Sequence, residues 1–173
     1  MLPELQQFVP SAVCLTCDGC CRFKEAESLW RPRLVQEEIK LAARQGLAER
    51  IFTPVLSADG RIRTHCSHGE HLCSFFNPSD HTCRIYQARP FECRLYPFIL
   101  NKMNQQIVVC VHLHCPYIQA AEASPQFQEY AAYLKEYFSH RDVREFLKRN
   151  PTLISDYSAY QNELRELFVI SLS

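Results

Sequence analysis

The apolar residues of this chain change their spacing along its length. Between Leu34 and Ile51 they recur at every fourth position, and Glu37 and Glu38 lie near the start of this stretch. This spacing predicts an amphipathic helix whose positive N-terminal end lies beside those carboxylates. Residues 52–97 show no such period and carry cysteines and histidines instead. We therefore expect sparse secondary structure there, with metal ligands organising the backbone.

Two short apolar runs flank a polar turn in the middle of the chain. Phe98–Leu100 and Ile107–Val111 have the composition of strands, and Asn104 lies in the turn between them. Asp59-Gly60 marks another turn. The sequence thus predicts one short hairpin in a helix-rich chain.

Beyond residue 120 the helical period returns. Ser124-Pro125 suits the N-cap and first turn of a helix, and the apolar residues after it keep helical spacing as far as Phe138. Ser139, with Asp142 three residues on, resembles a second helix start, and Asn150-Pro151 ends that helix. The pattern then repeats at Tyr157, Tyr160, Leu164, Leu167 and Phe168. We therefore expect a helical C-terminal region.

Length and composition indicate a single domain, and the predicted helices and hairpin make its class α+β. The chain has 173 residues, of which 47% are hydrophobic, and this is enough for one sizeable core. We divide it into a cysteine-rich region, residues 1–119, and a helical extension, residues 120–173, packed on the same domain. Irregular cysteine-rich loops around a metal centre complete the expected fold.

Charge and hydropathy exclude several classes of partner. The formal net charge is +0, so no global field favours nucleic acid or a membrane surface. The apolar run at 107–111 is far too short to span a bilayer, and the first residues lack the basic and apolar segments of a signal peptide. We expect a cytoplasmic protein whose cysteines stay reduced, which favours metal binding over disulfides.

The ten cysteines are the strongest chemical signal, and all of them lie between residues 14 and 115. Cys14, Cys17 and Cys20 fall at every third position, so one turn of chain can bend three sulfurs toward a common centre. Iron–sulfur clusters use such a C-x2-C-x2-C run, and zinc uses half of it with a second pair. Cys21 directly follows Cys20, and consecutive side chains usually point in different directions. These two thiols can therefore serve different centres.

Iron and zinc both remain open at this point. The ferredoxin spacing and the remote Cys115-Pro116 favour iron, whereas a four-cysteine zinc site needs only two pairs and no redox partner. Either thiolate site is negatively charged, and arginines close to the candidate ligands in sequence can neutralise it: Arg22, Arg84, Arg89 and Arg94. Six of the seven histidines lie within 65–114 and offer further ligands or proton carriers, although the cysteines alone suffice.

No recognisable catalytic motif accompanies the cysteines. The chain has four glycines and no G-x-G, so it contains neither a dinucleotide fingerprint nor a P-loop. It also lacks a nucleophile elbow and an H-E-x-x-H motif. The hypothesis that the protein is an enzyme therefore depends on the metal centre alone, and the enzyme class it suggests is an Fe–S oxidoreductase.

The complete cysteine series resembles the YkgJ-type cysteine cluster family. The resemblance is carried by C-x2-C-x2-C-C at 14–21, by Cys73 ahead of a polar loop, and by Cys115-Pro116. Between them, Cys83–Pro97 fits C-x2-Y-x2-R-P-x2-C-R-x-aromatic-P. The resemblance covers about residues 12–118 and implies zinc or iron chelation, in some relatives with Fe–S oxidoreductase activity. Cys66 and Cys110 fall outside the pattern.

Removing these two cysteines leaves eight predicted ligands: Cys14, Cys17, Cys20, Cys21, Cys73, Cys83, Cys93 and Cys115. We assign the thiols at 14, 17, 20 and 115 to one centre and those at 21, 73, 83 and 93 to another. The favoured function is binding of an iron–sulfur cluster, as [4Fe–4S], with an electron-transfer role and a redox partner. The alternative is a structural Zn²⁺ module whose helical tail binds a protein.

Overall fold

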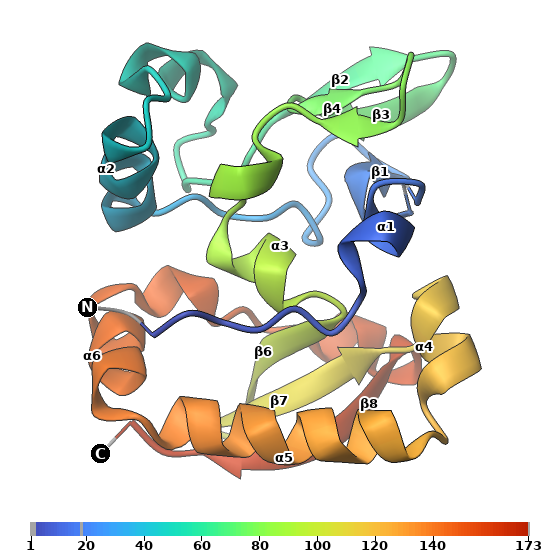
Figure 1. The fold of residues 1–173 in the computed structure, drawn as a ribbon, viewed down its shortest axis with the longest axis vertical. Coiled ribbons are helices and arrows are strands. Elements are labelled where there is room, and N and C mark those ends of the chain that lie inside the picture. The colour runs from blue at the N-terminus through green and yellow to red at the C-terminus, as the bar shows by residue number, and fades with distance from the viewer. Residues whose placement is uncertain (1–2, 18, 173) are drawn as a thin grey trace. The chain divides into compact units, whose positions relative to one another are not determined.

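A computed structural model describes residues 3–17 and 19–172 of the chain. It divides into two compact units, which can be followed by colour in Figure 1. Pro10–Arg94 forms the first, which we call the cysteine unit, and Met1–Val9 with Leu95–Ser173 forms the second, which we call the sheet unit. The boundary between the two units after Arg94 falls inside the region 1–119, which we treated as one region because it contains all the cysteines. With 41% helix and 23% strand, the content fits the expected α+β class.

The helices and strands alternate along the chain and most are short. The described α-helices are α1 (Ser11–Cys14), α2 (Gln36–Arg44), α3 (Phe91–Leu95), α4 (Pro116–Ala121), α5 (Pro125–Ser139) and α6 (Arg141–Arg149). The 3₁₀ turns are η1 (Gly19–Cys21), η2 (Glu49–Ile51), η3 (Thr53–Val55), η4 (Tyr86–Ala88), η5 (Pro151–Leu153) and η6 (Ser158–Glu163). The strands are β1 (Arg22–Phe23), β2 (Thr64–Ser67), β3 (Glu70–Cys73), β4 (Phe76–Asn77), β5 (Thr82–Cys83), β6 (Phe98–Met103), β7 (Gln106–His112) and β8 (Leu164–Ile170).

The cysteine unit contains more strand than its sequence predicts. β1, β3 and β2 form an antiparallel sheet in that order, and β4 pairs with β5. His68 and Gly69 join β2 to β3, both with positive φ, as a two-residue hairpin turn requires. The prediction of one short hairpin is therefore wrong. The cysteine-rich stretch folds into hairpins of two to four residues per strand, too short to show a period in the sequence.

The predicted helix over Leu34–Ile51 is present as α2 but ends at Arg44. Gly46 has φ +92°, and the N–H of Leu47 donates to the carbonyl of Ala42 at 3.1 Å. A second bond, from the N–H of Gly46 to the carbonyl of Ala43, completes a Schellman motif, which terminates a helix. The apolar spacing continues past this stop, which is why the periodicity overestimated the helix.

Glu38 connects α2 to α3, the helix that carries Cys93. One carboxylate oxygen accepts from the N–H of Val35 at 3.1 Å, and the other accepts from the N–H of Phe91. Arg94 lies 3.7 Å from the same carboxylate. Burial raises the pKa of Glu38 to about 7, and these donors act in the opposite direction. A single buried side chain thus fixes the position of α3 within the cysteine unit.

The sheet unit is built on β6, β7 and β8, which pair antiparallel in that order. The predicted hairpin over 98–111 is confirmed, and Asn104 and Gln105 form its turn, both with positive φ. The prediction of a helix over Tyr157–Phe168 is wrong, because η6 is followed by β8. The Leu-Phe-Val-Ile run at its end favours a strand, and the open edge of β7 supplies the pairing partner.

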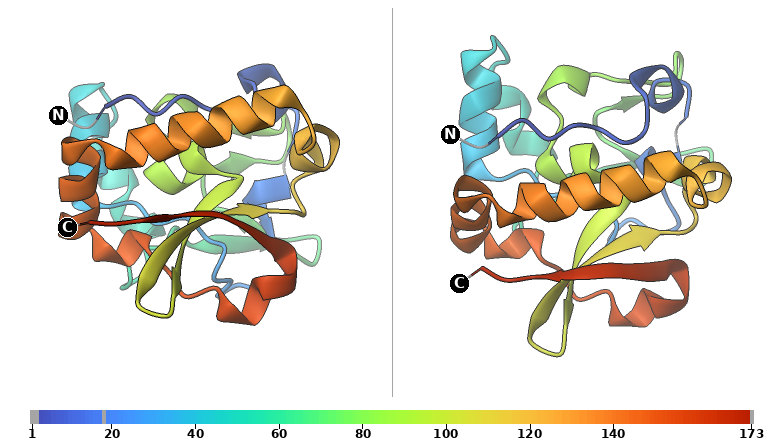
Figure 2. Two further views of the ribbon diagram at one scale, coloured as in Figure 1. Left: turned by 90° about the horizontal axis from the view of Figure 1, so that it is seen from below. Right: turned by 60° about the horizontal axis from the view of Figure 1, so that its bottom comes forward.

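Helix α5 lies along the β6–β7–β8 sheet, as Figures 1 and 2 show. Ser124 caps it, as predicted, by accepting a hydrogen bond from the N–H of Phe127 at 3.2 Å. The ring of Phe127 stacks on Phe98 of β6 with centroids 5.8 Å apart, and Tyr130 packs on the same ring at 5.1 Å. These aromatic contacts join helix to sheet.

The N-terminal segment 3–9 belongs to the sheet unit. The hydroxyl of Tyr130 donates to the carbonyl of Gln6, and the N–H of Gln6 donates to the hydroxyl of Tyr133 at 2.9 Å. Helix α6 begins one residue later than predicted, because the ring of His140 rather than Ser139 caps it. It ends before Asn150-Pro151, as predicted.

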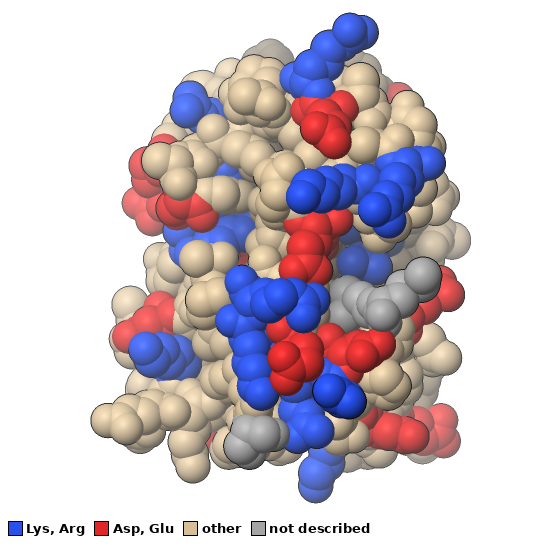
Figure 3. All heavy atoms as spheres, turned by 90° about the vertical axis from the view of Figure 1, so that its left-hand side faces the viewer, with Lys and Arg blue, Asp and Glu red and all other residues tan. Residues whose placement is uncertain are grey.

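The surface carries both signs of charge. On the face in Figure 3, Lys and Arg side chains alternate with Asp and Glu, in keeping with the formal net charge of +0. Among the described helices, none is long and apolar enough to cross a membrane.

Candidate metal centre

Seven of the eight predicted ligands belong to the cysteine unit, and Cys115 belongs to the sheet unit. Each lies in or beside a short element: Cys14 at the end of α1, Cys17 after it, Cys20 and Cys21 in η1, Cys73 at the end of β3, Cys83 at the end of β5, Cys93 in the middle of α3, and Cys115 at the N-cap of α4.

Six thiols of the cysteine unit lie near enough to affect one another's ionisation. A charge on Cys20 raises the pKa of each of the other five. The six, which we call the thiol group, are Cys14, Cys20, Cys21, Cys73, Cys83 and Cys93. The structure therefore brings together four segments separated by up to 79 residues of sequence.

Cys20 and Cys21 do not point apart, as consecutive side chains usually do. The side chains interact through a hydrogen bond, which raises the pKa of Cys21 together with its burial. The tight 3₁₀ turn η1 places the two sulfurs together. A charge on Cys20 also raises the pKa of Cys73, Cys83 and Cys93, which we predicted from the sequence to belong to a different centre. The local argument for two separate centres thus does not apply to this pair.

Backbone N–H groups are directed at two of the sulfurs. Cys73 accepts from Phe75 and Phe76, and Cys83 accepts from Ile85. These donors follow each cysteine by two or three residues, in the turns at the ends of β3 and β5. Hydrogen bonds of this kind stabilise a thiolate and orient a metal ligand.

One arginine of the four considered in the sequence donates directly to a cysteine in the described contacts. The guanidinium of Arg89 lies 3.3 Å from the sulfur of Cys14 and stacks over the ring of Tyr86, 3.6 Å from its centroid. The others make different contacts: Arg22 pairs with Glu70, Arg84 donates to the carbonyl of Ser74, and Arg94 pairs with Glu38.

Burial is the main influence on the pKa of four members of the thiol group. It raises the pKa of Cys73 to about 12 and is the largest influence on Cys14, Cys83 and Cys93, whose pKa values are also raised. Several thiolates cannot coexist there without a compensating cation, and a metal reverses this balance by deprotonating its ligands. Soft sulfur donors with N–H and guanidinium partners fit zinc or iron–sulfur chemistry.

The two cysteines outside the family pattern have other surroundings. Cys66 is exposed on β2, and Cys110 is fully buried in β7. Burial raises the pKa of Cys110 to about 11, while the side chain of Asn101 acts in the opposite direction. Cys110 thus lies in the strand expected for it, as a small apolar side chain.

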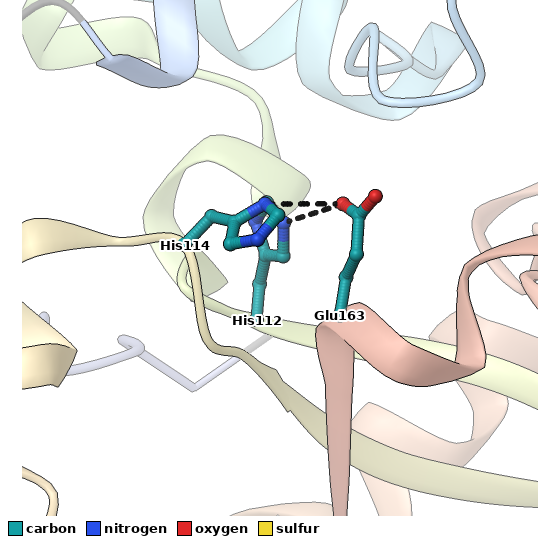
Figure 4. A group of neighbouring side chains, drawn as sticks. All are labelled: His112, His114 and Glu163. Atoms are coloured by element: carbon teal, nitrogen blue, oxygen red, sulfur yellow. Dashed lines mark hydrogen bonds and ion pairs between the residues drawn. The ribbon is translucent and has the colours of Figure 1, made fainter.

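A second cluster, which the sequence did not reveal, lies in the sheet unit. Figure 4 shows His112, His114 and Glu163 with their polar atoms turned toward one another. The ligand atoms all lie within 4.8 Å of each other. The H-x-H pattern of His112 and His114, directly after the predicted strand at 107–111, was the sequence signal for this cluster, because alternate residues of an extended chain lie on the same face. Glu163 could not have been found, because the segment after it was expected to be helical, whereas it forms β8 and pairs with β7.

Comparison with known proteins supports one family. The model described as "CxxCxxCC: Putative zinc- or iron-chelating domain" matches residues 13–116, which include all eight predicted ligands. No curated protein matches the chain, and no solved structure matches it.

Proposed function

Because this chain belongs to the family of CxxCxxCC zinc- or iron-chelating domains, we propose that its cysteine unit binds an iron–sulfur cluster. The thiol group carries this proposal. Its six sulfurs offer more than the four thiolates that either one zinc ion or one [4Fe–4S] cluster takes, so the preference for iron rests on the C-x2-C-x2-C spacing of Cys14, Cys17 and Cys20.

The hydrogen bonds around the sulfurs support a specific set of ligands. Cys73 and Cys83 have backbone donors, Cys14 has Arg89, and Cys93 lies on a helix held by Glu38. We propose the thiol group as the source of ligands, with Cys17 beside it in sequence, while Cys115 of the sheet unit stays a prediction from the family pattern. When bound, the cluster would supply one-electron redox chemistry; the chain's own residues bind it and set its charge environment.

An electron-transfer role is the finer part of this proposal. Cys20 is exposed, and Cys14 and Cys21 are half-buried, so one edge of the thiol group reaches the surface. A centre at a surface can exchange electrons with a protein partner without a substrate pocket. This agrees with a sequence that has no recognised catalytic motif.

Purification without oxygen tests the proposal. We expect brown protein with iron and acid-labile sulfide in equal amounts, about four of each per chain for [4Fe–4S]. Metal analysis, sulfide analysis and visible absorption check this. Stoichiometric zinc without sulfide, from cells supplied with ample iron, would overturn it.

The second candidate is a structural zinc module. The backbone donors at Cys73 and Cys83 would serve zinc thiolates equally well, and the family description includes zinc. In that case the protein would be colourless and stable in air, and its function would depend on a protein partner. The same metal analysis separates the two candidates.

A further inference from the structure

We infer that the sheet unit holds a second, cysteine-free metal site, formed by His112, His114 and Glu163, which takes a divalent transition-metal ion such as Zn²⁺. All three residues lie within one compact unit, so the site does not depend on how that unit meets the cysteine unit. None of its three ligands is among the cysteines predicted for the iron–sulfur centre, although His114 directly precedes Cys115.

The separation of the ligand atoms carries this inference. Nε2 of His112 lies 3.4 Å from Oε2 of Glu163, and Nδ1 of His114 lies 3.3 Å from the same oxygen. A charged N–H···O hydrogen bond is shorter, about 2.7–2.9 Å. Zinc–ligand bonds of about 2.0–2.2 Å place two ligands of one tetrahedral ion about 3.4 Å apart. Both measured distances match that edge length.

Backbone pairing fixes two of the three ligands, His112 and Glu163, while His114 lies in the turn after β7. His112 pairs with Leu164 across β7 and β8, and the N–H of Leu113 donates to the carbonyl of Glu163 at 2.9 Å. The N–H of His112 donates to the carbonyl of Pro97, also at 2.9 Å. Three segments of the sheet unit therefore fix the first histidine and the carboxylate. Such preorganisation is what a metal site needs.

Tyr96 orients the buried histidine. Its hydroxyl lies 2.9 Å from Nδ1 of His112, the ring nitrogen on the far side from Glu163. When Nδ1–H donates to this oxygen, the lone pair of Nε2 is directed at the proposed ion. Metal-binding histidines usually have such a partner on their second nitrogen, which fixes the tautomer.

The exposure of the three side chains leaves one side of the site open. His112 is only 12% exposed, Glu163 is 27% exposed, and His114 is 59% exposed. Two histidines and one carboxylate fill three positions, so water or a small ligand would complete the coordination. Open His₂Glu sites of this composition bind zinc, and two-histidine–carboxylate sites also bind ferrous iron.

The test adds ⁶⁵Zn²⁺ to the full chain as purified, with its cysteine-bound metal in place. We expect one additional Zn²⁺ per chain by equilibrium dialysis, with shifts in the ring-nitrogen NMR signals of His112 and His114 but not of His140. Glu163→Gln and His114→Ala should each weaken this binding by at least about 100-fold, and Tyr96→Phe by about tenfold.

Glu166→Gln on β8 and His65→Ala in the cysteine unit are the matched controls, since both residues are exposed and lie outside the cluster. They should bind zinc like the wild type. Two results would overturn the inference: no additional Zn²⁺ with unmoved ring signals, or wild-type affinity in Glu163→Gln and His114→Ala. The first result would show that His112, His114 and Glu163 form a polar network without a metal. The NMR readout uses the wild-type chain, so the test does not depend on a variant that folds.

Discussion

The guanidinium of Arg89 donates a hydrogen bond to the sulfur of Cys14 across 3.3 Å, between residues 75 positions apart in sequence. The ring of Tyr86 orients this arginine, because the same guanidinium stacks on it. Stacking fixes the plane of an arginine, and so directs its N–H groups. This arrangement places a fixed positive charge at one end of the thiol group.

The first prediction concerns this charge. A positive charge beside a cluster sulfur favours the reduced, more negative form, so Arg89→Gln should lower the reduction potential. We expect the ratio of reduced to oxidised cluster to change about tenfold, which for one electron is a shift of roughly 60 mV in an anaerobic redox titration. Arg84→Gln is the matched control, because Arg84 donates to the carbonyl of Ser74. Equal potentials in wild type and Arg89→Gln would contradict the prediction.

The second prediction separates ligands from other cysteines. Serine keeps the shape of cysteine but replaces a soft thiolate by a poor donor, so Cys73→Ser, Cys83→Ser and Cys93→Ser should lose most of the metal. The measurement is metal per chain. Cys66→Ser and Cys110→Ser should retain it, since Cys66 is exposed on β2 and Cys110 is buried in β7. The reverse result would show that the ligand assignment is wrong.

The third prediction concerns removal of the metal. Structural zinc sites contribute about 10–16 kcal/mol, comparable to the whole stability of a domain, and we expect a similar dependence for the metal of the cysteine unit. Chelation should therefore expose the amides of Pro10–Arg94 to hydrogen exchange, while β6, β7 and α5 stay protected by the aromatic core around Phe98 and Phe127. Exchange measured by mass spectrometry with and without chelator tests this. Unchanged protection in Pro10–Arg94 would disprove it.

The fourth prediction is a pH dependence that arises from Glu38. Its folded-state pKa of about 7 exceeds the ordinary 4.5, so the folded protein holds the proton more tightly than the unfolded chain. The resulting stability is fully present below pH 4.5 and is lost as the pH rises through 7. The loss corresponds to roughly 3 kcal/mol at most.

Glu38→Gln cannot ionise and should lack this component. We expect the difference in unfolding free energy between wild type and Glu38→Gln to change by about 1–3 kcal/mol between pH 4.5 and 8, with the wild type losing stability relative to the variant. Urea titrations at several pH values measure it. Acid removes metal from the wild type and from Glu38→Gln alike, so this effect cancels in the difference between their unfolding free energies. The exposed neighbour Glu37→Gln is the control, and a difference that is constant with pH would refute the assignment.

The sequence by itself determined the features that depend on neighbouring residues. Ser124 caps α5 through a backbone N–H three residues away, and the polar turn at Asn104 joins two strands that are adjacent in the chain. The C-x2-C-x2-C-C motif identified the family, because ligand spacing within one turn is a local property. Local hydrogen bonds and ligand spacing depend only on which residues are neighbours in the chain, so the sequence predicts them.

Only the tertiary structure decided the features that join distant segments. The run after Glu163 has helical spacing but forms β8, since the edge of β7 offers hydrogen bonds that a helix would not use. That strand brings Glu163 to His112 and His114, which lie about 50 residues earlier. Glu38 is an ordinary first-turn carboxylate in the sequence, and its pKa is raised because the packing of α3 buries it. Packing, burial and strand pairing depend on which surfaces meet, and no local pattern of residues specifies that.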